Sequence, residues 1–259
     1  MDLGISGRKA IICASSRGLG RGCAFALAQA GCEVIVNGRD GKTLDATAAE
    51  LRQATGAKVT AVPGDVATPA GQAALLGACP EPDILVNNNA GPPFRDFREL
   101  TRQQMIDGVI ANMVVAVELI QKVIEPMRAK KFGRIVNITS GSVKMPLAGL
   151  DLSSGARAGL TAFLAGVARS VAASNVTINF LLPGTFDTER LQSNIAANAK
   201  TKGISIDQAR SERMATVPAK RFGTPDEFGA ACAFLCSAQA GYITGQNLLI
   251  DGGAFPGAM

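Results

Sequence analysis

A turn with two glycines near the N-terminus is the first segment whose residue types and spacing could bind a ligand. Gly18 and Gly20 follow a short apolar run and open an apolar helical pattern that contains Cys23 and Leu27. Glycines at such a turn let the backbone approach a phosphate group, and the helix N-terminus supplies free N–H groups and a favourable dipole. The segment therefore indicates a pyrophosphate site, although a tight turn without a ligand also explains a glycine pair.

Short apolar runs alternate with longer helical patterns along the chain. The strands and helices that they predict hold the glycine turn in place. The runs span residues 10–13, 33–37, 58–62, 84–87, 134–139, 177–182 and 246–250. Their near-continuous apolar character is typical of strands buried on both faces, and the intervening segments have the length of crossover helices. We expect an α/β fold: a single doubly wound Rossmann-type domain over residues 1–259, with a seven-stranded parallel sheet and helices on both faces. Ligands of such sheets bind at the carboxyl ends of the strands.

The composition favours one compact globular domain. The chain has 259 residues, of which 47% are hydrophobic and 18% charged, and this length suits a single core. The net charge of +5 comes from scattered Lys and Arg, without the basic runs of a nucleic-acid-binding face. No apolar run approaches the roughly 20 residues of a membrane span. We therefore expect neither a nucleic-acid nor a membrane partner.

The cysteines and the lack of histidine limit the chemistry further. The six cysteines lie in apolar patterns without a disulfide framework or C-x-x-C spacing, and residues 1–9 show no signal peptide, so we expect a cytoplasmic protein with free thiols. The sequence contains no histidine, which removes the commonest zinc ligand and the commonest general base. We expect no metal site.

The glycine turn and later motifs resemble, in order and spacing, those of the classical short-chain dehydrogenase/reductase family, especially its 3-oxoacyl-acyl-carrier-protein reductases. The turn is similar to the family's T-G-x-x-x-G-x-G motif, with Cys13 in place of Thr and Ala14 in place of the first Gly. Residues 242–246 and 251–253 are similar to the family's C-terminal signature. The matches extend over residues 8–253 and imply a nicotinamide dinucleotide cofactor.

After later strands, the resemblance implies further cofactor contacts. Asp65 and Val66 resemble the pair that holds the adenine, and residues 183–188 resemble the loop that grips the nicotinamide carboxamide. Anchoring the family's N-N-A-G motif on the fourth strand places it on residues 87–90, whereas anchoring it on residues 89–91 requires one extra residue. The expected cofactor contacts are Ala14, Ser16, Arg17, Gly18, Leu19, Gly20, Arg39, Asp65, Val66, Asn88, Asn89, Ala90, Arg157, Pro183, Gly184, Phe186 and Thr188.

The resemblance also implies a catalytic group, from which two family residues are missing. Asn112 and Ser140 match the active-site Asn and the catalytic Ser. The family's Tyr-x-x-x-Lys pair falls on Ser153 and Arg157, and the only tyrosine, Tyr242, belongs to the C-terminal signature. A serine hydroxyl is a weaker acid than a phenol, and arginine stays protonated. The expected catalytic residues are therefore Asn112, Ser140, Ser153 and Arg157, with an altered proton donor.

Two basic side chains have further expected roles, one in cofactor binding and one as a substitute proton donor. Arg157 can still bind ribose hydroxyls. Lys144, in the loop after Ser140, is the nearest candidate for a substitute proton donor, and a solvated loop lysine is the alternative.

The end of the second strand predicts NADP(H) rather than NAD(H). An NAD enzyme places an acidic residue there for the ribose 2′-hydroxyl, and this chain has Gly38. Arg39, together with Arg17 in the glycine turn, could bind a 2′-phosphate through charge-assisted hydrogen bonds. Asp40 is the nearest acid.

Two classes of function follow. The first is an NADP(H)-dependent oxidoreductase that reduces a small-molecule carbonyl, 3-oxoacyl-like or related, by hydride transfer. The second is a catalytically impaired dinucleotide-binding protein that acts as a sensor or partner subunit. Residues 187–218 are polar, helical in pattern and inserted before the last helix, so we expect either a substrate lid or a mobile surface loop.

The resemblance further implies a homo-oligomer, either a tetramer or a dimer. Family members pair through two long helices, here at roughly residues 101–130 and 153–173, and near the C-terminus. The second of these helices carries an apolar stripe that includes Phe163 and Val167, which burial within one subunit also explains.

Overall fold

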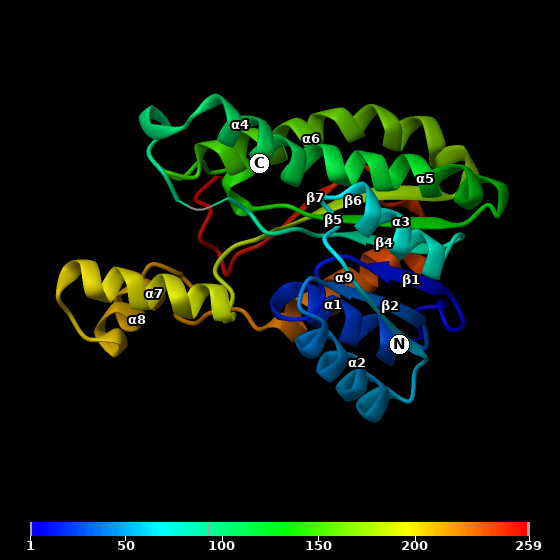
Figure 1. Cartoon of the computed structure of the whole chain (residues 1–259), viewed down its shortest axis with the longest axis horizontal. Coiled ribbons are helices and arrows are strands. Elements are labelled where there is room, and N and C mark those ends of the chain that lie inside the picture. The colour runs from blue at the N-terminus through cyan, green and yellow to red at the C-terminus, as the bar shows by residue number, and fades with distance from the viewer. Residues whose placement is uncertain (1, 93, 258–259) are drawn as a thin grey trace.

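The computed structural model describes residues 2–92 and 94–257, in which the strands form one parallel sheet in the order β3-β2-β1-β4-β5-β6-β7 (Figure 1). The strands are β1 (Lys9–Ile12), β2 (Glu33–Gly38), β3 (Val59–Pro63), β4 (Ile84–Asn87), β5 (Gly133–Ile138), β6 (Val176–Pro183) and β7 (Asn247–Ile250). All seven predicted strands are present in these residues, with ends that differ by at most one residue from the predicted ones. The predicted domain limits, Met1 and Met259, lie outside the described residues.

Helices cover both faces of this sheet (Figure 1). They are α1 (Gly18–Gln29), α2 (Gly41–Thr55), α3 (Pro69–Ala78), α4 (Arg102–Val109), α5 (Val115–Ala129), α6 (Asp151–Val171), α7 (Glu189–Lys202), α8 (Ile206–Ala215) and α9 (Pro225–Cys236). Short 3₁₀ turns are η1 (Phe97–Glu99), η3 (Gly141–Val143), η4 (Ala172–Ser174) and η5 (Gln239–Tyr242). The fold is thus the predicted single Rossmann-type domain.

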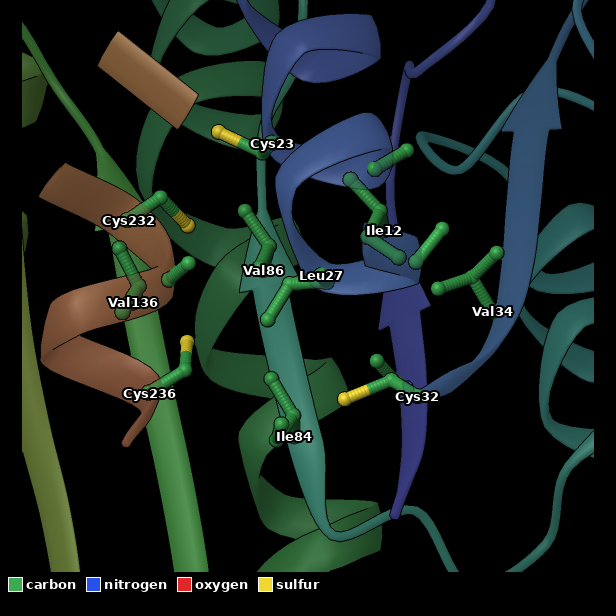
Figure 2. Packing of buried hydrophobic residues seen from close by; sticks show 14 of the residues in the cluster. Ile12, Cys23, Leu27, Cys32, Val34, Ile84, Val86, Val136, Cys232 and Cys236 are labelled. Atoms are coloured by element: carbon green, nitrogen blue, oxygen red, sulfur yellow. The ribbon is translucent and has the colours of Figure 1, made fainter. Parts of the chain in front are cut away.

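The core has two layers, one on each face of the sheet. Side chains of α1, α2 and α9 pack on one face, and those of α3, α5 and α6 pack on the other. Figure 2 shows the first layer, in which Cys23 of α1 lies opposite Cys232 and Cys236 of α9. These helices meet closely because Gly22 and Gly229 have no side chains: an added Cβ on Gly22 would collide with the Pro225 carbonyl. All six cysteines are buried and free.

The predicted long helix at residues 101–130 is not continuous. A π-helical turn, η2 (Ile110–Val114), separates α4 from α5. Such turns insert an extra residue into the helix and often occur at functional sites. Here the turn contains Asn112, one of the expected catalytic residues.

The segment at residues 187–218 forms a small helical unit beside the sheet. It contains α7 and α8, which pack against each other and project from the body of the domain (yellow in Figure 1). Their shared cluster, which includes Ile195, Ala209 and Phe222, is separate from the two main core layers. The unit is therefore joined to the domain mainly at its ends.

Residues 2–92 and 94–257 contain neither a membrane-spanning helix nor a candidate metal-binding cluster. Among their helices, none combines the length and the apolar character needed to cross a membrane. The same residues contain no group of three or more His, Cys, Asp or Glu side chains that could hold a metal ion.

Candidate active site

A large pocket lies at the carboxyl ends of β1, β2, β4, β5 and β6, the sheet edge that the strand pattern predicts. Its wall is formed by the residues that follow each of these strands, by the first turns of α6 and α7, by the end of α8 and by the segment after β7. Of the expected site residues, it is lined by Ser16, Arg17, Gly18, Leu19, Arg39, Asn88, Asn89, Ala90, Ser140, Ser153, Arg157, Pro183, Gly184, Phe186 and Thr188. Loops that converge at this edge of a parallel sheet are the usual ligand site of the fold.

The glycine turn is held in shape by β2. The backbone N–H of Ala14 donates to Asn37 Oδ1 at 3.2 Å, and that of Ser15 donates to the Asn37 carbonyl at 2.7 Å. Ala14 adopts a left-handed φ of 44°, a conformation that favours glycine. Gly20 has no room for a side chain, because a Cβ would collide with the Ala14 carbonyl and lie 2.9 Å from Asn88 Nδ2. Ala14 and Gly20 therefore support the turn from behind the pocket wall.

The end of β2 carries a glycine, Gly38, at the position expected for an acidic side chain. A Cβ on Gly38 would lie 2.8 Å from Ser16 Oγ. Arg39 is 74% exposed at the pocket, and its Nη1 lies 4.0 Å from Asp65 Oδ2. The Asp40 carboxylate accepts a 2.7 Å hydrogen bond from the backbone N–H of Thr43 at the start of α2. The Thr43 side chain and this backbone N–H together lower the pKa of Asp40. The nearest acid is thus already paired with a helix N-terminus.

Two further expected cofactor residues, Asp65 and Val66, lie off the pocket wall. Val66 is buried in the core with α3, and the Asp65 carboxylate accepts a hydrogen bond from the backbone N–H of Ala67 at 2.9 Å. Neither residue lines the pocket. Their contact with an adenine stays a prediction.

Consecutive asparagines fix the end of β4 to its neighbours. Asn87 Nδ2 donates to Asn137 Oδ1 of β5 at 3.0 Å, and Asn88 Nδ2 donates to the Ala14 carbonyl at 3.1 Å. Asn89 Nδ2 donates to the carbonyl of Ala111 in the π-turn, also at 3.1 Å. The three side chains therefore join the glycine turn, β5 and the π-turn by hydrogen bonds and form the floor of the pocket at this point.

Asn112 lies beneath this floor rather than on the main pocket wall. Its Nδ2 donates to the Gly108 carbonyl at 3.0 Å, and its buried Oδ1 has no hydrogen-bond partner in the described part of the chain. Asn112 and Arg157 line a second, smaller cavity that is large enough for a water molecule. The structure thus separates Asn112 from Ser140 and places it behind Arg157.

Ser140, Ser153 and Arg157 line the same pocket. Ser140 Oγ, just beyond β5, accepts the Ser142 backbone N–H at 3.1 Å. Arg157 Nη1 donates to the Ile138 carbonyl at 2.7 Å, and its Nε donates to Ser153 Oγ at 3.3 Å. Burial, together with the positive charge of Arg190, lowers the pKa of Arg157 to about 10. Ser153 and Arg157, which lie one helical turn apart at the positions predicted for the catalytic pair, are therefore hydrogen-bonded to each other.

The predicted substitute donor is not in the site. Lys144 does not line the pocket, and its Nζ lies 5.8 Å from the centre of the Phe255 ring. Tyr242 is fully exposed in η5 and also lies off the pocket wall. Neither side chain therefore lines the pocket beside Ser140 and Ser153.

The structure adds pocket residues that the motifs did not indicate. The charged ones are Asp40, Glu189, Arg190 and Arg213, and Asp251 of the C-terminal signature also lines the pocket. The large apolar ones are Phe94, Met145, Leu147, Leu150, Leu191, Val217, Leu249 and Phe255. A signal for Glu189 and Arg190 was present, since they follow Thr188 directly; Phe94 and Phe255 come from segments without a motif.

The fold and the pocket together define a Rossmann-type α/β protein with its ligand site at the carboxyl ends of a parallel sheet. The family described as enoyl-(acyl carrier protein) reductase matches residues 13–254. The chain belongs to this family, within the classical short-chain dehydrogenases/reductases.

Known relatives cover almost the whole chain. The NADPH-dependent reductase BacG of Bacillus subtilis is 28% identical over 96% of this chain and 98% of its own. The 3-oxoacyl-[acyl-carrier-protein] reductase FabG of Vibrio cholerae is 31% identical over 98% of this chain and 99% of its own. The structure of L-sorbose reductase from Gluconobacter frateurii, complexed with NADPH and L-sorbose, has a TM-score of 0.94 at 29% identity and covers 99% of this chain and 100% of its own.

Proposed function

We propose that this protein is an NADP(H)-dependent reductase that transfers hydride to a carbonyl substrate, 3-oxoacyl-like or related, with an altered proton-donor site. The observation that carries the proposal is that Ser140, Ser153 and Arg157 line one pocket with the glycine turn. The similarity to BacG, FabG and sorbose reductase, all reductases and two of them described with NADPH, supports the same reaction class.

The residues present fit a phosphorylated dinucleotide. Gly18 and Leu19 lie at the N-terminus of α1 on the pocket wall, where backbone N–H groups favour a pyrophosphate. Gly38 provides no carboxylate that would repel a 2′-phosphate, and the guanidinium of Arg39 is exposed beside it. When bound, NADPH supplies the hydride; the protein's own groups orient the carbonyl and handle the proton.

Ser153 would take part in that proton step differently from a phenol. Its Oγ accepts a hydrogen bond from Arg157 Nε, so the hydroxyl proton is free to be donated to the carbonyl oxygen. The adjacent guanidinium would stabilise negative charge as it develops there. Because a serine hydroxyl is a weak acid, the expected result is slow reduction of ordinary ketones.

The unit formed by α7 and α8 would serve as the substrate lid. Residues of its first turn, including Glu189 and Arg190, already line the pocket. Its small cluster is separate from the main core, so the unit can move without repacking the domain.

Two measurements on the same protein test this function. NADPH binding, followed by fluorescence titration, is compared with steady-state NADPH oxidation across a panel of carbonyl substrates. A Ser140→Ala variant provides the control: we expect unchanged NADPH binding and at least about tenfold slower turnover, because the carbonyl oxygen loses a hydrogen-bond donor. Tight binding without turnover of any carbonyl would favour the sensor or partner-subunit alternative, and absence of NADPH binding would refute both.

A further inference from the structure

Two guanidinium groups converge on one point of the pocket beside Gly91. A Cβ added to Gly91 would lie 3.3 Å from Arg190 Nη1 and 3.6 Å from Arg157 Nη2. Arg157 comes from α6 and is 92% buried, whereas Arg190 comes from the first turn of α7. Two like charges from separate elements therefore face the same space.

Neither guanidinium has a carboxylate partner within the described residues. Arg190 Nη2 donates to the Pro92 carbonyl at 3.3 Å, and the bonds of Arg157 go to the Ile138 carbonyl and Ser153 Oγ. Burying a charge without a counter-charge is costly, and the neighbouring charge of Arg190 adds to this cost for Arg157. The arrangement is thus suited to receive an anion.

The acids that line the pocket are already engaged elsewhere. Glu189 pairs with Arg17, and Asp40 caps α2. The Asp251 carboxylate accepts the backbone N–H groups of Gly253 and Phe255. No acidic side chain on the described pocket wall is therefore free to neutralise the two arginines.

Arg157 lies at the end of the pocket that holds the expected catalytic residues, and Arg190 faces it from α7. Arg157 is hydrogen-bonded to Ser153 and to the carbonyl of Ile138, two residues before Ser140. The glycine turn and Arg39 provide the phosphate sites already described. Large apolar side chains, including Phe94, Leu147 and Phe255, line the same pocket.

We propose that Arg157 and Arg190 bind a carboxylate of the substrate, so that the substrate is a carbonyl acid with an apolar body. This proposal rests on the proposed reductase function. Paired guanidinium groups bind carboxylates through charge-assisted, often bidentate hydrogen bonds. The pair would orient the acid so that its carbonyl faces Ser140 and Ser153.

The test compares 2-oxooctanoate with its uncharged methyl ester in the parent and in the variants Arg190→Ala and Arg190→Lys. We expect the parent to favour the acid in kcat/KM, and Arg190→Ala to lower kcat/KM for the acid roughly 10- to 100-fold while the ester changes little. Arg190→Lys should retain part of the preference. Arg128→Ala removes the same charge from an exposed ion pair on α5 and should change neither value.

A binding measurement separates failure of this proposal from failure of the reductase function. Calorimetric titration of 2-oxooctanoate into the NADP⁺-bound protein should show binding that Arg190→Ala weakens, even if no carbonyl is turned over. NADPH affinity should be unchanged in that variant. Equal binding of acid and ester by the parent, or a loss of NADPH affinity in Arg190→Ala with the acid preference intact, would overturn the proposal, and the second result would assign Arg190 to a cofactor phosphate.

Discussion

Arg17 Nη1 lies 2.6 Å from Glu189 Oε2 and thereby joins the glycine turn to the first residue of α7 across the pocket. Both side chains are more than half exposed, so the pair is worth at most about 1 kcal/mol. Arg17 is also an expected ligand of the 2′-phosphate. The ion pair and the phosphate would therefore compete for the same guanidinium.

Removing this competition should tighten NADPH binding. In Glu189→Gln the guanidinium of Arg17 is released, and we expect NADPH affinity to rise by up to about fivefold while NADH affinity stays constant. Fluorescence titration with both nucleotides measures the effect. Weaker NADPH binding in this variant would show that the ion pair helps to build the site.

Cofactor preference should depend on Arg39. We expect Arg39→Ala to weaken NADPH binding by roughly tenfold, because a charge-assisted contact with the 2′-phosphate is lost, and to leave NADH binding unchanged. Arg21→Ala serves as control, since Arg21 pairs with Glu50 and lies off the pocket wall. Equal NADPH affinity of Arg39→Ala and the parent, or tighter binding of NADH than NADPH by the parent, would contradict the assignment.

The family's proton donor can be restored in a double variant. Ser153→Tyr with Arg157→Lys should raise the rate of ketone reduction by roughly 10²-fold, the usual contribution of a positioned general acid. Each single change should do little, because the two groups act as a unit. Steady-state kinetics with a neutral ketone provide the measurement.

The matched control is Ser153→Phe with Arg157→Lys, which supplies the ring without the hydroxyl and should gain nothing. Met145 and Leu150 line the pocket nearby and could occupy the space of a ring, so a structure of the tyrosine variant with cofactor belongs to the test. Rapid ketone reduction by the parent would show that another donor exists.

Exposed apolar residues on α4 and α6 predict self-association. Phe163 is 51% exposed, and Met105 and Ile106 are 44% and 41% exposed, whereas Leu160 and Leu164 of the same α6 stripe are buried in the core. We expect light scattering at micromolar concentration to give a dimer or tetramer mass and Phe163→Glu to reduce it. A parent mass near 26.6 kDa would rule out the assembly.

Acid should weaken the start of α9 through Glu227. Two hydrogen bonds from Arg221 and one from the Thr224 backbone hold the pKa of Glu227 at about 2, below its ordinary value of 4.5. A carboxyl whose folded pKa is depressed stabilises the protein above its unfolded pKa and loses this contribution as pH falls from about 4.5 toward 2. The parent should thus lose its thermal-stability advantage over Glu227→Gln across this range. A constant difference in melting temperature would contradict this.

Much of the fold could be predicted because buried parallel strands leave a local signal. The apolar run that ends at Asn87 and the run that leads to Ser140 were visible, and both strands end within two residues of those positions. The motif residues that follow the strands converge at one edge for the same geometric reason. Predicting these parts required only local periodicity and the topology of the fold.

Other features depend on contacts between distant segments and left no local signal. Ala14 has a positive φ and donates its backbone N–H to Asn37 Oδ1 of β2, although alanine itself favours right-handed conformations. The convergence of Arg190 with Arg157 depends on how the chain after β6 returns across the end of β4. The position of Asn112 under the pocket floor follows from the π-turn, which interrupts an otherwise regular helical pattern.

The burial of all six cysteines affects how fast the native protein reacts with thiol-modifying reagents. Burial raises the pKa of the Cys13 thiol to about 12, and the thiols of Cys23, Cys232 and Cys236 lie between α1 and the sheet or α9 (Figure 2). Only an exposed thiolate reacts readily with an alkylating agent, so modification of these three thiols must wait until α1 and α9 separate. The rate of thiol labelling would then report the frequency with which the Rossmann core opens.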